Sequence, residues 1–246
     1  ATATRNSVTT PTATSTETVV PTQTSTPTAE PSSTTSVELH HEVDLDEYDR
    51  LVGSEGLSTN ASAALAGTGG GLAVSIDGPS AHYGEVQFSA LAAPAYHCRL
   101  YLDPNGLEML DWKNFIVVQT RSEWTARQWI VLRYRQGLYE LRLVVRDDRD
   151  VVHYGEYTAI SDVEHSIEFS VRHASHAGAA DGEAVLLVDG LQASELRALE
   201  LYDLAKRPDS LQLGAVSGVD AGTFGTFYLD EVVLREGETE IGPLAK

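Results

Sequence analysis

The chain has 246 residues and a formal net charge of −19, from 17 basic and 36 acidic side chains. A protein this acidic repels nucleic acid and anionic membrane surfaces, which argues against both as partners. No apolar run reaches the ~18 residues that a transmembrane helix needs, so no membrane span is predicted. Cys98 is the single cysteine, which excludes an intrachain disulfide. The fold must therefore be held together by its core.

Residues 1–36 differ in composition from the rest of the chain. They contain fourteen Thr, six Ser and four Pro, with only Arg5, Glu17 and Glu30 charged. Such a segment has too few apolar side chains to offset the entropy cost of ordering it. Its composition is typical of an O-glycosylated stalk, with an unmodified linker as the alternative. The predicted organisation is an arm over residues 1–36 and one all-β domain over residues 37–246.

The arm also has features of an assembly element. Val8, Val19 and Val20 lie in β-branched pieces that can add to the open sheet edge of a neighbouring copy. A head-to-tail contact of this kind propagates as a filament, so a homo-oligomer or filament is predicted. The protein is expected to be extracellular or at a cell surface, with its signal peptide already removed. O-linked glycans are predicted on Thr12, Thr14, Thr16, Thr22, Thr24, Thr26 and Thr28.

The stretch HHEVDLDE, residues 40–47, contains Glu42-x-Asp44-x-x-Glu47. This spacing resembles the acid signature of laminarinase-type glycoside hydrolases. Retaining glycosidases need two carboxylates about 5–5.5 Å apart, and carboxylates on one strand face permit this. In those enzymes the signature lies on a central strand, whereas here it falls on the first strand of the domain. We therefore expect an acidic edge strand and a non-enzymatic protein with no catalytic residues.

The domain reads as a succession of short strands. Gln136-Gly137 predicts a hairpin between the strands Trp129–Arg135 and Leu138–Arg146. Glu195–Lys206 is the one predicted helix, and Pro208 ends it. The absence of βαβ spacing predicts an all-β, two-sheet antiparallel jelly-roll sandwich. Alternating or β-rich patterns predict further strands at Leu72–Ile76, Glu85–Leu91, Cys98–Leu102, Phe115–Thr120, Val151–Thr158, Ile167–Arg172, Glu183–Asp189, Leu211–Val216 and Thr226–Arg235.

The second half of the domain resembles the concanavalin A-like, laminin-G-like jelly rolls of bacterial secreted and cell-surface proteins. The resemblance covers residues 165–190 and 209–242. It rests on a strand that begins with His165, the Leu-Val-Asp-Gly turn at 187–190 and the final strand ending in Asp230. This family includes lectins, glycanases, adhesion modules and structural domains. The resemblance therefore implies a fold more strongly than one function.

The same resemblance implies a structural Ca²⁺ site that joins the first and last strands, and no other cofactor. Glu42 and Asp230 match its ligands by position, and carboxylate oxygens are what Ca²⁺ prefers. The alternative is that both are solvated carboxylates. His40 and His41 are adjacent on a strand, so they point to opposite faces and cannot readily chelate one ion. No sequence pattern identifies a Ser/His/Asp triad.

A glycan-binding face is the second functional prediction. Trp129, Arg133 and Arg135 share one face of their strand, and Tyr139 lies across the turn. Sugar rings stack on aromatic faces while Arg donates paired hydrogen bonds. The alternative is that Trp129 caps the core and the arginines balance an acidic surface. Trp112 and Trp124 are interpreted as core or loop anchors.

Three functions follow, in order of preference. The first is an extracellular structural subunit whose arm packs on neighbouring subunits. The second is a stalked carbohydrate-binding module, and the third is a glycanase. Asn60 lies in an Asn-x-Ser sequon and is a predicted N-glycosylation site.

Overall fold

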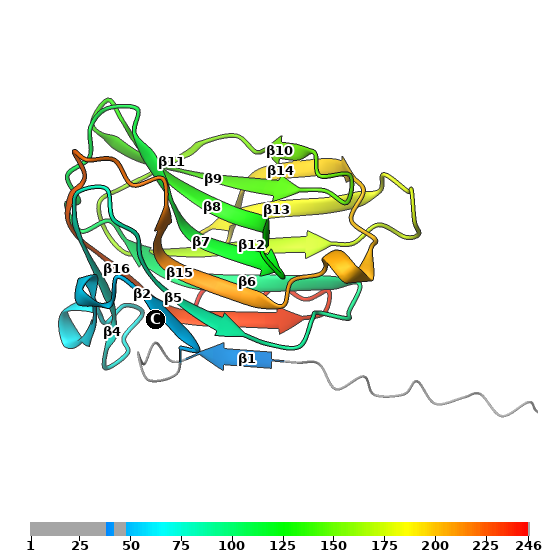
Figure 1. Ribbon diagram of the computed structural model, residues 1–246, viewed down its shortest axis with the longest axis horizontal. Coiled ribbons are helices and arrows are strands. Elements are labelled where there is room, and N and C mark those ends of the chain that lie inside the picture. The colour runs from blue at the N-terminus through cyan, green and yellow to red at the C-terminus, as the bar shows by residue number, and fades with distance from the viewer. Residues whose placement is uncertain (1–37, 42–47, 246) are drawn as a thin grey trace, which may run out of the picture. The chain divides into compact units, whose positions relative to one another are not determined.

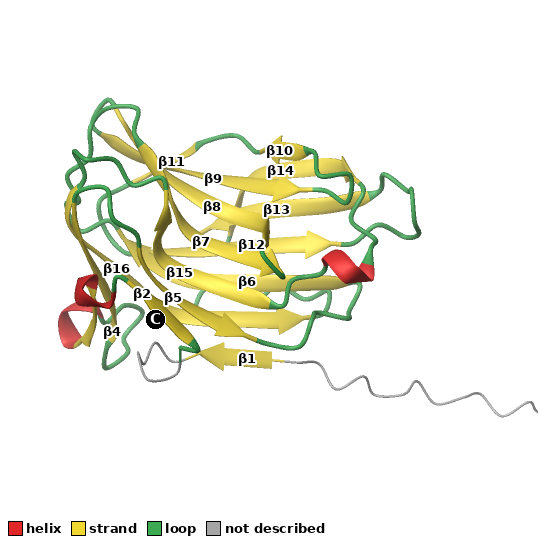
Figure 2. Ribbon diagram, viewed as in Figure 1, coloured by secondary structure: helices red, strands yellow, loops and turns green. Residues whose placement is uncertain are grey.

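The computed structural model describes residues 38–41 and 48–245. Two antiparallel sheets of eight strands each enclose one hydrophobic core (Figure 1). Helical structure in the described residues is limited to short 3₁₀ turns (Figure 2). The predicted all-β, two-sheet sandwich is therefore confirmed. No helix in the described part of the chain is long and apolar enough to cross a membrane.

The first sheet, sheet A, is built around the long last strand. Its order is β14-β13-β12-β6-β16-β4-β3, and β1 also pairs with β16, so the first and last strands are neighbours. The strands are β1 (Glu38–His41), β3 (Leu57–Asn60), β4 (Gly71–Asp77), β6 (Ala95–Asp103), β12 (His165–Arg172), β13 (Gly182–Val188), β14 (Leu191–Leu199) and β16 (Phe224–Glu236).

The second sheet, sheet B, contains the predicted central hairpin. Its order is β10-β9-β8-β7-β15-β5-β2, and β11 also pairs with β9. Gln136 and Gly137 both have positive φ, 52° and 87°, as the tight hairpin turn requires. The strands are β2 (Arg50–Val52), β5 (His82–Gln87), β7 (Asn114–Ser122), β8 (Thr125–Arg135), β9 (Leu138–Arg146), β10 (Val152–Tyr154), β11 (Thr158–Ile160) and β15 (Ser210–Ser217).

The core forms between the inward faces of the two sheets. On β9, Leu141, Leu143 and Val145 face inward, as their period-2 spacing predicts. On β6, Cys98 and its inward neighbours are likewise buried. Burial raises the pKa of the Cys98 thiol, with the Glu168 carboxylate as a smaller cause. The lone thiol is therefore a core side chain.

The predicted helix at Glu195–Lys206 is wrong. Residues 195–199 belong to β14, and only the 3₁₀ turn η4 (Leu204–Lys206) is helical. Leu196 and Leu199 have the i, i+3 spacing of a helix, but both pack toward the core from a bulged strand. The register shifts between their partners on β13, and Ala198 has a φ of 58°. The bulge inserts one residue and so imitates a helical period.

The strand predicted over Val151–Thr158 is divided in two. Both parts, β10 and β11, pair with β9. Gly155 lies between them, at a position where a side chain would be crowded by its neighbours. A Cβ there would lie 2.9 Å from Ser194 Oγ and 3.1 Å from the Leu143 carbonyl oxygen. The close contact at Gly155 marks the break between the two strands.

Residues 241–244 cross the outward side of sheet A and are called the strap below. The Glu168 carboxylate on β12 accepts hydrogen bonds from the N–H groups of Ile241 (2.9 Å) and Gly242 (2.8 Å). Arg99 donates to the Gly242 carbonyl at 3.2 Å, and the Leu244 N–H donates to the Tyr101 hydroxyl. Each of these three polar side chains under the strap therefore has at least one partner within the chain.

Candidate functional site

The outward side of β7, β8 and β9 in sheet B carries an unusual number of arginines. Inward residues of these strands fill the core, so the intervening positions point outward. These outward arginines define the arginine face: Arg121, Arg127, Arg133, Arg135, Arg142 and Arg146. Glu140 is the one carboxylate on the three strands, which leaves them a net charge of +5. Since the whole chain carries −19, the other residues carry −24.

Glu140 is shared by two arginines of the face. Arg133 lies opposite it across the β8–β9 pair and donates from Nε to Glu140 Oε2 at 2.7 Å. Arg135 Nη1 is 3.7 Å from the other carboxylate oxygen, beyond hydrogen-bonding distance. Arg135 instead stacks on the Trp112 ring, with its guanidinium carbon 4.5 Å from the ring centre. The Glu140 carboxylate is therefore hydrogen-bonded to Arg133 and only close to Arg135.

Arg142 lies between two aromatic rings. Its guanidinium carbon is 4.2 Å from the ring centre of Tyr157 and 4.8 Å from that of Tyr154. Arg133 contacts the same Tyr157 ring at 3.3 Å. Arg142 forms no hydrogen bond or ion pair with the described residues, and its Nε is buried without a partner. Stacking holds the guanidinium plane while its edge stays unpaired.

A continuous row of side chains crosses the face from strand to strand. Register places Glu85, Gln212, Gln119, Trp129, Val144 and Tyr154 side by side on β5, β15, β7, β8, β9 and β10. Gln119 donates to Gln212 at 3.0 Å, and Gln212 donates to Glu85 at 3.0 Å. The row spans five strand spacings, about 24 Å. It combines fixed amides at one end with aromatic rings at the other.

Three of the four predicted glycan-binding residues lie together on this face. Trp129, Arg133 and Arg135 all point outward and are half-buried. Tyr139 points the other way, so its assignment to this face is wrong. Its hydroxyl donates to the Leu107 carbonyl at 2.7 Å, and burial raises its pKa. Tyr139 and Arg133 stand on opposite faces of the sheet because alternate residues of a strand alternate sides.

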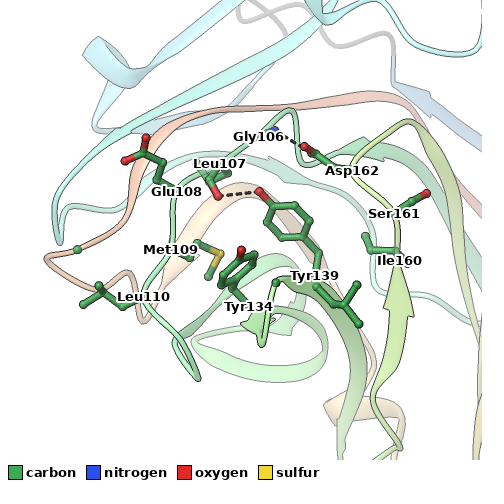
Figure 3. Close-up of a pocket in the computed structure, with 13 residues that line it drawn as sticks. Gly106, Leu107, Glu108, Met109, Leu110, Tyr134, Tyr139, Ile160, Ser161 and Asp162 are labelled. Atoms are coloured by element: carbon green, nitrogen blue, oxygen red, sulfur yellow. Dashed lines mark hydrogen bonds between the residues drawn. The ribbon is translucent and has the colours of Figure 1, made fainter.

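Tyr139 lines a cavity at one end of the sandwich (Figure 3). The cavity has a volume of about 560 Å³ and is also lined by Tyr134, Met109 and Ile160. Two of its polar groups are used within the chain, since Tyr139 donates to Leu107 and the Gly106 N–H donates to Asp162 (Figure 3). We therefore consider the arginine face, with its unpaired donors, the stronger candidate site.

Comparison with known proteins shows the fold and leaves the family open. The chain matches no family model and no curated protein. Among solved structures it is similar to an endo-β-1,4-glucuronan lyase from the fungus Trichoderma reesei, with a TM-score of 0.60 and 12% identity. That match covers 85% of this chain and 99% of the lyase.

Two further solved structures have the same architecture. The T. cruzi calreticulin globular domain matches with a TM-score of 0.55 and 8% identity, over 81% of this chain and 88% of that one. The binding domain of botulinum neurotoxin DC, solved in complex with SialylT, matches with a TM-score of 0.52 and 5% identity. That match covers 77% of this chain and 43% of the toxin chain. Identities this low establish a shared β-sandwich fold only.

The predicted Ca²⁺ ligands cannot be paired in the described residues, because Glu42 lies outside them. Asp230 is buried on β16, and its carboxylate accepts hydrogen bonds from the Leu65 N–H (2.8 Å), the Thr68 hydroxyl and the Glu231 N–H. Burial raises the pKa of Asp230, and these hydrogen bonds oppose the shift. No cluster of three metal-ligating side chains occurs in the described ranges. The Ca²⁺ site stays a prediction.

Of the predicted glycosylation and assembly sites, only Asn60 lies in the part of the chain that the structure describes. Asn60 is exposed, and its Oδ1 accepts from the N–H groups of Ser62 and Ala63, so it caps the 3₁₀ turn η3 (Ala61–Ala63). The predicted acid signature at 42–47 and the arm, including the seven threonines and the three valines, lie outside the described residues.

Ser161, His165 and Asp189 form a hydrogen-bonded chain that no sequence pattern identified. His165 Nε2 lies 2.9 Å from Ser161 Oγ, and His165 Nδ1 lies 2.7 Å from Asp189 Oδ2. The Asp189 side chain is 52% exposed, and its other oxygen accepts from the Ser166 N–H. The contacts join the β13–β14 turn to the start of β12.

The sequence analysis missed several aromatic residues of the face. Trp112 is 52% exposed and stacks on arginines, in contrast to the predicted core or loop anchor. Tyr154 and Tyr157 sit on and beside the divided strand and reach the face through pairing with β9. The available signal was the density of arginine on three consecutive strands.

Proposed function

We propose that the protein is a carbohydrate-binding module that uses the arginine face of sheet B. The observation that carries the proposal is the array of aromatic rings and fixed arginines on one sheet face. Sugar rings present C–H groups that stack on aromatic rings, while their hydroxyls accept hydrogen bonds from oriented donors. Trp112 and Tyr154 are 52% and 59% exposed, so both rings are accessible to a ligand.

The architecture supports this proposal. The β-sandwich resembles a glucuronan lyase, whose name specifies a polysaccharide, and a toxin domain solved with SialylT. Glucuronan is therefore a reasonable first ligand to test. We propose binding without cleavage, in keeping with the expectation of a non-enzymatic protein. Assembly into filaments through the arm remains a separate prediction, and the face described here favours the binding role.

Affinity measurements on a panel of neutral and acidic polysaccharides test the proposal. We expect Trp112→Ala and Tyr154→Ala each to weaken binding about tenfold, because each removes a stacking ring. Phe224→Ala is the matched control, because Phe224 is an exposed aromatic on sheet A, at 41%. Equal losses in all three variants, or no binding by the parent protein to any polysaccharide, would contradict a glycan site on this face.

A further inference from the structure

We infer that the arginine face selects polysaccharides that carry carboxylate groups, and that Arg135 and Arg142 bind those carboxylates. The inference rests on the proposed carbohydrate-binding function and specifies its ligand class. It begins from Arg142, which is half-buried and has no ion-pair or hydrogen-bond partner among the described residues. A partly buried charge without a partner is unfavourable, so an arriving anion gains more there than at a solvated arginine.

Arg135 supplies a second incompletely paired cation. Its side chain is 39% exposed, and its closest carboxylate contact is the 3.7 Å approach to Glu140. Glu140 is already bonded to Arg133, whose Nη2 lies 2.5 Å from Glu140 Oε2. Together, Arg133, Arg135 and Arg142 exceed the charge of Glu140 by two. This part of the face therefore attracts anions in an otherwise acidic protein.

The stacking geometry favours a planar anion. Trp112 covers one side of the Arg135 guanidinium, and the Tyr154 and Tyr157 rings cover Arg142. A stacked guanidinium is held in one plane, and its N–H donors lie along its edge. Because Nε of both arginines is buried, a carboxylate matches the Nη1–Nη2 edge with two parallel hydrogen bonds. The loss of side-chain entropy on binding is small because the stack has already restricted the arginine.

The surroundings favour an acidic sugar over other polyanions. A nucleic acid extends its phosphates well beyond one sheet face, where the other residues, at −24, would repel it. A glycan instead lies along the row through Trp129 and Tyr154, where rings are available for stacking. A uronic acid combines a stackable ring with a carboxylate in one unit. Both features of the face are then used by one ligand.

The experiment compares one oligosaccharide with and without its charge. Calorimetric titration of the full chain uses a glucuronate oligosaccharide and its carboxyl-reduced, neutral counterpart. We expect the acidic form to bind at least about tenfold more tightly, and its affinity to fall as salt is raised. Equal affinity for both forms would overturn the inference and leave the proposed function standing. If neither form nor any other glycan bound, the proposed function itself would fail.

Substitution of single arginines tests which residues cause the preference for the acidic oligosaccharide. Arg135→Gln and Arg142→Gln are each expected to weaken binding of the acidic form about tenfold and to leave binding of the neutral form unchanged. Arg172→Gln is the control, because Arg172 is 46% exposed on sheet A and the change in net charge is the same. If Arg172→Gln matched the other two, general electrostatics would explain the preference and the assignment would be wrong.

Two further measurements keep the test decisive. Thermal melts establish that each variant is folded, and Arg135→Gln alone can decide the question because its side chain is 39% exposed. Single-stranded DNA of matched charge is titrated in parallel. We expect it to bind at least about tenfold more weakly than the glucuronate form, because it cannot avoid the acidic surroundings. Equal or tighter DNA binding would overturn selection for acidic sugars.

Discussion

The two sheets both place arginines and other polar groups on their outward sides, but they satisfy them differently. On sheet A, Arg99 and Glu168 are each only 3% exposed, and the strap supplies hydrogen-bond partners to both, in addition to Glu231 and His97. On sheet B, Arg142 has no such partner among the described residues. The comparison shows that similar side chains are bonded within the chain on one face, whereas on the other face an arginine is left without a bonded partner among the described residues.

The largest expected effect is a loss of stability on the outward side of sheet A, which the strap covers. Glu168→Ala removes the acceptor for two strap N–H groups and for His97, whose Nδ1 lies 2.9 Å from Glu168 Oε1. Removing one member of a buried charged network costs about 3–5 kcal/mol, so urea denaturation should show a loss of that size. Glu183→Ala is the control: it removes a carboxylate on β13 that is 24% exposed and pairs with the exposed arginines Arg172 and Arg197, so it should change stability little. Equal small losses would mean that the strap does not stabilise sheet A.

Lowering the pH should reduce the stability of the fold through His173, which adjoins sheet A. Burial lowers the pKa of His173, next to β12, to about 4, and the nearby Arg207 charge adds to the shift. The unfolded chain takes up this proton near pH 6.5 while the folded chain does not, so stability falls as pH drops from about 6.5 to 4. We expect a loss of about 2 kcal/mol between pH 7.5 and 5 from this group.

Denaturation of His173→Gln at the two pH values checks the assignment. Its pH dependence should shrink by that amount, whereas His176→Gln, at an exposed neighbouring histidine, should behave like the parent. At still lower pH, Glu168 becomes important. Burial alone would raise its pKa, but His97 and the strap N–H groups lower it overall. The stability from Glu168 is therefore present above its unfolded pKa and lost as pH falls through the lowered value.

The smallest expected effect is on the stability of the arginine face. Arg142→Gln should change the free energy of unfolding by less than about 1 kcal/mol, because no bonded partner is left behind. Arg99→Gln is the matched substitution on sheet A and should cost more, because Arg99 is bonded to the Gly242 carbonyl and to Glu231. Similar losses in the two variants would remove the distinction between the faces.

Local patterns were enough to predict much of the fold. The turn at Gln136-Gly137 and the alternation of β8 and β9 define a hairpin within a short stretch of chain. The wrong secondary-structure predictions occur where a contact between residues distant in sequence interrupts the alternation of a strand. The bulge that brings Leu196 and Leu199 to the core depends on pairing with β13, and the break at Gly155 depends on contacts with Ser194 and β9.

The candidate site could be predicted only in part for the same reason. Trp129, Arg133 and Arg135 share a strand, so their common face follows from alternation. Tyr139 is close in sequence, but in the hairpin it pairs with Tyr134, which points to the opposite side of the sheet from Arg133 and Arg135. Tyr139 therefore points away from the arginine face. Trp112 and Tyr157 come from loops, and their approach to the arginines is set by tertiary packing. No spacing rule connects them to β8 or β9.

The buried thiol of Cys98 can be used to measure how often the folded core opens. The side chain has no solvent exposure, and its raised pKa keeps it protonated and unreactive in the folded state. Alkylating reagents can modify it only in molecules whose sheet A has opened transiently. The rate of modification, followed by mass spectrometry without denaturant, therefore measures how often the native core is breached. Because the chain has no second cysteine, a single mass increment counts each event without ambiguity.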